Sequence, residues 1–415
     1  MQMVSKINGE RLYTRIMELG EIGKNTYNGV HRLALSNEDK QAQILVTRWM
    51  EEAGMTVSHD HFGNLIGRKE GKSPHLPVVM IGSHIDSVRN GGRFDGVIGV
   101  LAGIEIVQAL SDARVEHHHP IEVVAFCEEE GSRFNDGLFG SRGMVGKLTR
   151  EDFNKVDENS LTRFEALKTF GFGINPDKFK ESVRTSEEIK LYLEMHIEQG
   201  PYLDTTNQSV GIVRGIAGPA WYTIKLQGTA GHAGTVPMNL RHDPLAGAAE
   251  VIGEIEKLCK AEVEQQTVGT VGILQVFPGS SNVIPSEVEF SLDLRDLNLS
   301  RRNKVFNEIE EKLNQVCKER GLSYNIESNM QVDPVECSNE VVDVLCEVSQ
   351  SMGINAPLMV SGAGHDAMLL AEITEIGMVF VRCTDGISHN PKEWAEMDDI
   401  VNGTRILYET VLTFI

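Results

Sequence analysis

The most informative stretch of this chain is Gly82-Ser-His-Ile-Asp-Ser-Val-Arg-Asn-Gly-Gly-Arg-Phe-Asp-Gly96. It follows an apolar run at residues 78–81, which is typical of a buried strand in a parallel sheet. Polar side chains at the carboxyl end of such a strand lie where open α/β sheets bind ligands. His84, Asp86 and the following Asp95 are residue types that bind first-row metals. Taken alone, the segment also fits a loop of solvated polar residues.

Size and composition limit the class of protein. At 415 residues, the chain is too long for one ordinary core, so two domains are expected. A net charge of −21 disfavours nucleic acid and anionic membranes as partners. The six cysteines are scattered, which argues against a disulfide framework and a thiolate zinc site. Without an apolar run that could span a bilayer or an N-terminal signal, a cytoplasmic protein with no membrane partner is expected.

The first half of the chain alternates predicted helices and strands. Helices are expected over residues 11–19, 36–53 and 96–110, and strands over 64–68, 78–81, 121–127 and 189–197. This alternation is typical of an α/β domain with a mainly parallel sheet. After an interruption, a helix at 340–352, a strand at 376–382 and a helix at 398–414 are expected to complete it.

The interruption has a different order of elements. Strands are predicted at residues 220–227, 268–277, 287–294 and 322–328, with helices at 243–260 and 300–320. This β-α-β-β-α-β order is ferredoxin-like α+β. The sequence therefore predicts an inserted domain at 212–328 and a larger domain formed by 1–211 and 329–415.

Metal-ligand types follow four predicted strands of the larger domain. They are His84 with Asp95, Glu129 with Glu130, His196, and His389. A single histidine is more often a surface residue than a ligand, and the run at 117–119 is interpreted as solvated. Three separate histidines after strands, two of them with carboxylates nearby, are much harder to obtain by chance.

The acidic run Glu128-Glu-Glu130 also favours a metal. Adjacent carboxylates repel one another near a dry core, and a dication offsets that repulsion. Neighbouring side chains on extended backbone point to different sides, so one can bind metal while the other acts as a general base. The alternative is an acidic helix N-terminus.

Several motifs together resemble the M20-type metallohydrolases, and within them the branch of N-carbamoyl-L-amino-acid and allantoate amidohydrolases. They are residues 82–88 and 91–96, Glu129-Glu-Gly-Ser-Arg-Phe134, Glu194-Met-His-Ile-Glu-Gln-Gly200, Gly231-His-Ala-Gly-Thr-Val-Pro-Met238 and Gly386-Ile-Ser-His-Asn-Pro391. The histidine of His-Ile-Glu-Gln-Gly sets this branch apart from the peptidases. The sequence departs from the pattern at Gly231, where relatives often carry a polar residue.

The resemblance implies a site for two divalent ions, with zinc, manganese, cobalt and nickel all suited to the ligands. Asp95 would bridge the ions. His84 and His196 would bind one ion, and Glu130 and His389 the other. Two further residues would support the chemistry: Asp86 would accept a hydrogen bond from His84 and fix its tautomer, and Glu129 would be the general base.

The resemblance also implies substrate contacts. His232 would stabilise the oxyanion in the active site of a partner subunit, so a homodimer through the inserted lid and dimerisation domain is expected. Asn282 and Arg295 would hold the substrate carboxylate, although an ion pair with Asp293 or Asp296 is an equal alternative for Arg295. The remaining predicted contacts are Gln199, Ser361 and Gly362.

The activity implied is hydrolysis of the ureido C–N bond of N-carbamoyl-L-amino acids to amino acid, carbon dioxide and ammonia. Allantoate amidohydrolase uses the same chemistry and is the first alternative. β-Ureidopropionase, a peptidase and a non-catalytic metal-binding dimer are less favoured. Apolar Ile216, Ala217, Pro219 and Ala220 suggest a slot for an amino-acid side chain, which favours the carbamoyl substrate.

Overall fold

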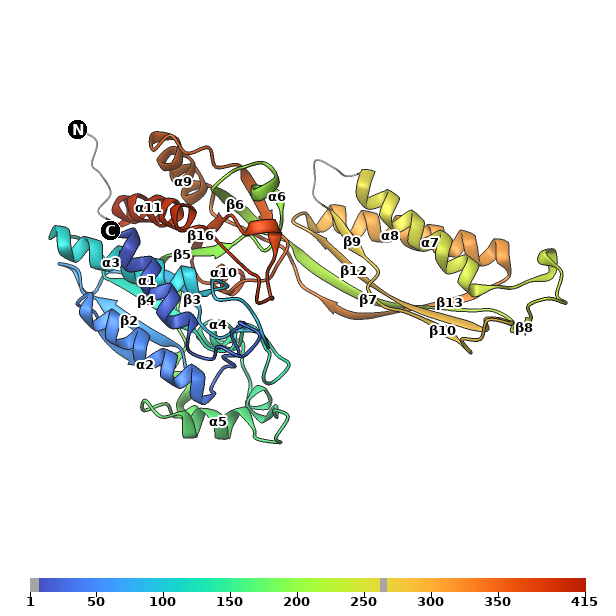
Figure 1. Ribbon diagram of the computed structural model, residues 1–415, viewed down its shortest axis with the longest axis horizontal. Coiled ribbons are helices and arrows are strands. Elements are labelled where there is room, and N and C mark those ends of the chain that lie inside the picture. The colour runs from blue at the N-terminus through green and yellow to red at the C-terminus, as the bar shows by residue number, and fades with distance from the viewer. Residues whose placement is uncertain (1–6, 262–266) are drawn as a thin grey trace. The chain divides into compact units, whose positions relative to one another are not determined.

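The structure is a computed structural model that describes residues 7–261 and 267–415 (Figure 1). It divides into two compact units. Unit 1 comprises Met1–Arg214, Cys337–Met359 and Gly364–Ile415, and unit 2 comprises Gly215–Glu336 and Val360–Ala363. Unit 2 begins three residues later than the expected 212–328. It also ends later, because its last long strand continues to Gln331 and a short strand follows at Val335–Glu336.

Unit 1 is built on a sheet whose centre is parallel. The strands lie in the order β1 (Thr56–His59), β2 (Leu65–Lys69), β4 (Ile121–Phe126), β3 (Val78–His84), β5 (Ile189–Ile197), β16 (Glu375–Val381) and β6 (Val210–Ile216), with β15 (Leu358–Ser361) also paired to β6. β4, β3, β5 and β16 are parallel to their neighbours in this group, and the outer strands are antiparallel. Every residue of β3 and β4 is buried, as expected for a strand covered on both faces.

Helices cover this sheet. They are α1 (Gly9–Gly20), α2 (Asn37–Glu52), α3 (Val97–Ala113), α9 (Asn339–Ser351) and α11 (Met397–Phe414). α3 packs on β3 and β5, and α1 and α11 pack on α3 (Figure 1). Ser36 caps the start of α2, because its side chain accepts a hydrogen bond from the backbone N–H of Asp39.

Residues 128–188 fold around aromatic side chains, with short helical segments that the sequence did not reveal. These are α4 (Phe139–Met144), η1 (Arg150–Asn154), α5 (Arg163–Phe170) and η2 (Pro176–Ser182). At their centre, Arg163 Nε donates to Glu128 Oε2 at 2.9 Å, and neither side chain is exposed. The guanidinium also lies 4.2 Å from the centre of the Phe139 ring. This buried pair fixes the backbone immediately before Glu129.

Unit 2 has the predicted ferredoxin-like order. Its sheet runs β10 (Leu274–Phe277), β12 (Glu287–Asp296), β7 (Gly218–Gln227) and β13 (Ser323–Gln331), with β9 (Val268–Thr270) paired to β12. The predicted strand at 268–277 is divided into β9 and β10. A separate short pair joins β8 (Gly231–His232) to β11 (Val283–Ile284), and β14 (Val335–Glu336) pairs with the end of β6.

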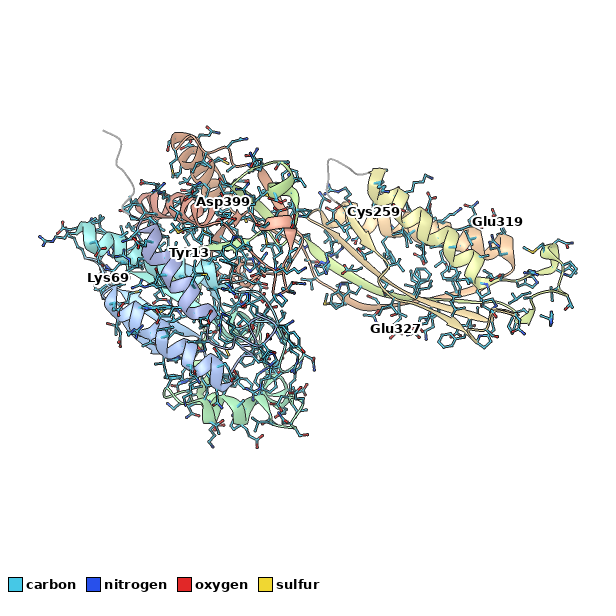
Figure 2. The ribbon with its side chains drawn as sticks, in the orientation of Figure 1. Tyr13, Lys69, Cys259, Glu319, Glu327 and Asp399 are labelled. Atoms are coloured by element: carbon cyan, nitrogen blue, oxygen red, sulfur yellow. The ribbon has the colours of Figure 1, made fainter. Side chains whose placement is uncertain are left out.

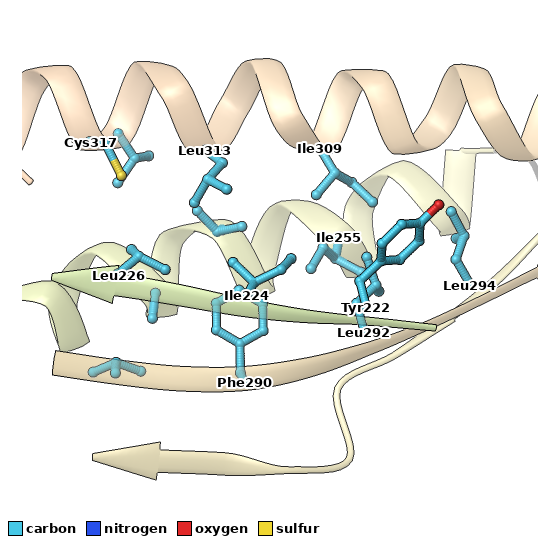
Figure 3. Packing of buried hydrophobic residues seen from close by; sticks show 14 of the residues in the cluster. Tyr222, Ile224, Leu226, Ile255, Phe290, Leu292, Leu294, Ile309, Leu313 and Cys317 are labelled. Atoms are coloured by element: carbon cyan, nitrogen blue, oxygen red, sulfur yellow. The ribbon is translucent and has the colours of Figure 1, made fainter. Parts of the chain in front are cut away.

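One face of this second sheet carries α7 (Pro244–Ala261) and α8 (Leu299–Arg320). Figure 3 shows Ile224 and Phe290 of the strands pointing toward Ile309 and Leu313 of α8. Burial alternates along the whole of β12, so this face is apolar while the other carries polar residues.

The remaining short elements are α6 (Tyr202–Thr205), α10 (Asp366–Leu370), η3 (Met238–Leu240) and η5 (Thr384–Gly386). Across the described residues, no helix is both long and apolar enough to cross a bilayer. All six cysteines are free, as the sequence predicted. Acidic side chains such as Glu319 and Glu327 lie on the surface of unit 2, where water solvates their charge (Figure 2).

Candidate metal centre

The carboxyl ends of the central parallel strands meet at one edge of the unit 1 sheet. His84 is the last residue of β3, and His196 is the penultimate residue of β5. Glu130 follows β4, His389 follows β16, and Asp95 lies just before α3. The structure therefore brings together at this edge all five side chains that were predicted as metal ligands.

The five predicted ligands form two groups of three that share Asp95. His84, Asp95 and His196 have ligand atoms within 4.8 Å of one another, and so do Asp95, Glu130 and His389. Asp95 Oδ1 lies 3.0 Å from His196 Nε2, whereas Asp95 Oδ2 lies 3.0 Å from His389 Nε2. One carboxylate thus presents a different oxygen to each group, which is the arrangement that a bridging ligand requires.

Hydrogen bonds to backbone carbonyls orient the imidazole rings of His84 and His196. His84 Nδ1 donates to the backbone carbonyl of Asp86 at 3.1 Å, and His196 Nδ1 donates to the carbonyl of Ile197 at 2.9 Å. With Nδ1 held by a backbone carbonyl, each ring directs its Nε2 toward Asp95, where it is placed to bind an ion. Backbone carbonyls commonly orient metal-binding histidines in this way.

Asp86 does not act through its carboxylate as predicted. Its side chain lies 3.7 Å from His84 Nδ1, outside hydrogen-bond distance, because the chain turns after β3 and brings the carbonyl closer. The carboxylate instead accepts from the backbone N–H groups of Glu129 and Glu130, both at 3.3 Å. Asp86 therefore orients the backbone of two acidic site residues, while its carbonyl fixes the tautomer of His84.

The centre holds more buried negative charge than its surroundings balance. Among the described residues, the ion-pair partners of Asp86, Asp95, Glu129 and Glu130 are histidines only. Glu130 Oε1 is buried and has no hydrogen-bond partner. An excess of carboxylates beside converging imidazoles fits divalent cations, which supply the missing positive charge.

The pKa values reflect this crowding. Burial, together with the charge of Glu130, raises the pKa of Glu129 well above its usual value, and burial with the charge of Asp95 does the same to Glu130. Burial opposes ionisation of Asp95 as well, but hydrogen bonds from His196 and His389 hold its pKa well below the usual value. The carboxylate shared by both groups is therefore the one held most firmly as an anion.

Glu129 lies outside the two groups around Asp95, but its carboxylate forms a third possible metal-binding group with His84 and Glu130. Its Oε2 is 3.6 Å from His84 Nε2, and its carbonyl accepts from the backbone N–H of Leu138. Residues 128–130 do not begin a helix, since the next helix starts at Phe139, so the alternative of an acidic helix N-terminus is wrong. A carboxylate next to the ligands, with a raised pKa, is suited to accept and release a proton.

Gln199, which was predicted to contact the substrate, lies among the predicted metal ligands. Its amide Nε2 lies 3.2 Å from Asp95 Oδ2 and 3.3 Å from His389 Nε2, inside the ligand cluster. The residue has a φ of 58°, in the left-handed region that residues other than glycine rarely adopt. This conformation turns the amide toward the two ligands, so a direct substrate contact remains a prediction.

The predicted residues of unit 2 form two small groups. In the first, the backbone N–H of Ala233, next to His232, donates to the carbonyl of Asn282 at 3.0 Å. The ring Nδ1 of His232 accepts from the N–H of Gly234 at 3.1 Å. The neutral ring therefore carries its proton on Nε2, which leaves a donor of the kind that stabilises an oxyanion.

The second group contains Arg295 and the loop at residues 361–363. The guanidinium pairs with both oxygens of Asp293, at 2.9 and 2.8 Å, which is one of the two alternatives considered for it. Its Nη1 also donates to the carbonyl of Gly362 at 2.6 Å, and Ser361 Oγ donates to the carbonyl of Ala363. Arg295 and the predicted substrate loop thus lie together.

Glu393 and Ser388 also lie around the centre, and neither was predicted from the sequence. Buried Glu393 accepts hydrogen bonds from the backbone next to Asp95, and Ser388 Oγ contacts both carboxylates. The ring of buried His365 lies 4.6 Å from that of His196. Glu393 lies four residues after His389, and that closeness along the chain was the only available signal.

Two of the four residues expected to form an apolar slot, Ile216 and Ala220, are buried by packing within the chain. Ala220 belongs to the hydrophobic core between the unit 2 sheet and its helices, and Ile216 is fully buried. The run His117-His-His119 is also less solvated than predicted, since His117 is buried and its Nδ1 donates to the carbonyl of His119. In both places the side chains satisfy local packing.

Comparison with known proteins places the chain among metal-dependent hydrolases. Residues 80–413 match the model of peptidase family M20/M25/M40. An N-carbamoyl-L-amino-acid amidohydrolase of Pseudomonas sp. (strain NS671) is 65% identical over 409 residues, covering 99% of both chains. Another, from Geobacillus stearothermophilus, is 47% identical over 405 residues and 98% of both chains. An allantoate deiminase of Arabidopsis thaliana is 34% identical, over 93% of this chain and 78% of that protein.

A solved structure has the same fold throughout. An amidase of the hydantoinase/carbamoylase family from Burkholderia multivorans superimposes with a TM-score of 0.93 at 35% identity, covering 99% of this chain and 98% of that one.

Proposed function

Because the chain belongs to peptidase family M20/M25/M40, we propose that it hydrolyses the ureido C–N bond of N-carbamoyl-L-amino acids. The observation that carries this proposal is the division of the two Asp95 oxygens between two ligand groups, with Glu129 beside them. The 65% identity to an N-carbamoyl-L-amino-acid amidohydrolase supports the choice of substrate class.

Two divalent ions fit the centre. His84, Asp95 and His196 would hold one, and Asp95, Glu130 and His389 the other. When bound, such ions lower the pKa of water and stabilise negative charge that develops on a substrate oxygen. Zinc, manganese, cobalt and nickel all accept this mixture of imidazole and carboxylate.

Glu129 transfers a proton from the attacking water to the leaving nitrogen. It takes a proton from the attacking water, whose oxygen adds to the carbamoyl carbon, and then transfers it to the leaving nitrogen. The C–N bond to that nitrogen breaks and releases the amino acid and carbamate, which decomposes to carbon dioxide and ammonia. The bonds from Asp86 to the backbone of Glu129 and Glu130 hold this base beside the ligands.

Unit 2 would complete the site in a homodimer. His232 would donate from Nε2 to the developing oxyanion in the partner subunit, with Asn282 beside it. Apolar side chains at the edge of the unit 2 sheet support an interface there: Ile273, Leu274 and Phe277 are exposed on and next to edge strand β10. Sedimentation that gives the mass of one chain at micromolar concentration would contradict the dimer.

A substrate panel separates this proposal from its rival. The purified protein, supplied with zinc, manganese, cobalt or nickel, is assayed for ammonia release. We expect turnover of N-carbamoyl-L-methionine, little with its D-form, and less with allantoate or N-carbamoyl-β-alanine. Turnover of allantoate alone would instead assign the chain to allantoate hydrolysis, the activity of the Arabidopsis relative.

Arg295 is the proposed carboxylate ligand of unit 2. Replacement by alanine is expected to raise KM for N-carbamoyl-L-methionine about tenfold or more, since charge-assisted hydrogen bonds worth ~2 kcal/mol are lost. Lys225→Ala, on the same face of the neighbouring strand and paired with Glu289, is the matched control and should leave KM unchanged. An unchanged KM for Arg295→Ala would limit Arg295 to its ion pair with Asp293.

A further inference from the structure

Glu393 is a buried carboxylate that the proposed chemistry does not use. Only 2% of the residue is exposed. Its Oε1 accepts hydrogen bonds from two consecutive backbone N–H groups, those of Phe94 at 2.9 Å and Asp95 at 3.2 Å. These bonds reach the backbone of the shared ligand from the segment that carries His389.

The other oxygen of Glu393 is bound as well. Its Oε2 lies 3.2 Å from Ser388 Oγ, and that hydroxyl is also 3.3 Å from Asp95 Oδ2. Ser388 directly precedes His389, so the same carboxylate contacts the neighbours of two ligands. The ring of Trp394 packs edge-on against Phe94, with centroids 5.4 Å apart. Residues 388–394 therefore contact residues 94–95 in two ways, through the hydrogen bonds of Glu393 and Ser388 and through the packing of Trp394 on Phe94.

The space around Glu393 is tightly fitted. A Cβ added at Gly92 would lie 2.0 Å from the Glu393 carboxyl group, closer than any real contact. The loop before Asp95 therefore needs glycine at this position to admit the glutamate. Asp86 makes a matching pair of bonds to the backbone of Glu129 and Glu130.

We propose that Glu393 is a positioning residue that fixes the shared ligand Asp95 and joins it to the segment of His389. The proposal rests on the metal centre of the proposed function, not on the identity of the substrate. Removal of a residue that hydrogen-bonds to a metal ligand commonly lowers the metal affinity by about 10- to 100-fold. Glu393 should act on ion binding and on kcat, with little effect on KM.

The test titrates zinc alone into the metal-free, full-length protein by calorimetry. Glu393→Ala should weaken zinc binding by about 10- to 100-fold and reduce kcat while KM stays within about threefold. Glu393→Gln should recover most of the zinc affinity, because its amide oxygen can still accept from both backbone N–H groups. Glu187→Ala, an exposed glutamate, is the control and should bind zinc like the wild type.

Gly92→Ala gives an independent arm, because it displaces the carboxylate without removing it. It should reproduce the loss of zinc affinity, and the Gly92→Ala/Glu393→Ala double variant should lose little more than either single variant. Wild-type zinc affinity in Glu393→Ala, or an equal loss in the alanine and glutamine variants, overturns the proposal. Because no substrate is present, these outcomes are independent of which ureido acid is cleaved. If Glu393→Ala fails to fold, the Glu393→Gln and Gly92→Ala titrations decide.

Discussion

Replacement of Glu129 by glutamine is expected to reduce kcat about 10³-fold. The amide has nearly the same shape, so the packing beside His84 is retained, but it cannot take a proton from water. Removal of a general base of this kind costs far more rate than the loss of one substrate contact. The measurement is ammonia release from N-carbamoyl-L-methionine at saturating substrate, with the metal content of each preparation determined in parallel.

The control separates proton transfer from loss of metal. Glu187→Gln changes an exposed glutamate in the same way and should keep full activity. Glu129→Gln should retain the wild-type metal content, because both groups around Asp95 stay intact and the glutamine oxygen can still bind beside His84 and Glu130. A variant that keeps more than about one-tenth of the wild-type kcat would remove Glu129 from the role of base.

Asp95→Asn is expected to have an effect of similar size for a different reason. Asparagine is neutral and has one acceptor oxygen, so it cannot serve the groups of His84–His196 and Glu130–His389 together. We expect metal content to fall by at least one ion per chain and kcat to fall by at least about 10³-fold, since metal ions supply several kcal/mol of transition-state stabilisation. Elemental analysis and steady-state kinetics of the same samples check both expectations.

Asp398→Asn is the matched control, because Asp398 is exposed at the start of α11, away from the ligands. It should bind metal and turn over substrate like the wild type. If Asp95→Asn kept the full metal content, Asp95 would not be the shared ligand.

The parts of the fold that could be predicted have a pattern in the sequence. β3 and β4 are mainly apolar because both faces of the central sheet are covered. β12 alternates because only one face packs on α7 and α8. Residues 131–188 have no such period. Their short helices are fixed by aromatic packing and by the Arg163–Glu128 pair, whose partners are 35 residues apart.

The site, like the fold, has some parts that could be predicted from the sequence and others that could not. Ligands at strand ends could be predicted, because parallel strands bring their carboxyl ends to one edge wherever they lie in the sequence. The roles of Asp86 and Glu393 could not, because each acts on backbone N–H groups through a turn whose geometry has no sequence signal. Gln199 was predicted as a substrate contact. Its positive φ and the contacts of its amide with Asp95 and His389 could not be predicted.

The geometry of the site implies that Asp95 holds two divalent ions, one with His84 and His196 and the other with Glu130 and His389. Anomalous diffraction at the absorption edge of the bound metal, from crystals grown with excess zinc or manganese, tests it most directly. Two anomalous peaks per chain are expected, one on each side of the Asp95 carboxylate. No peak among these side chains, or a single peak that does not contact Asp95, would contradict it.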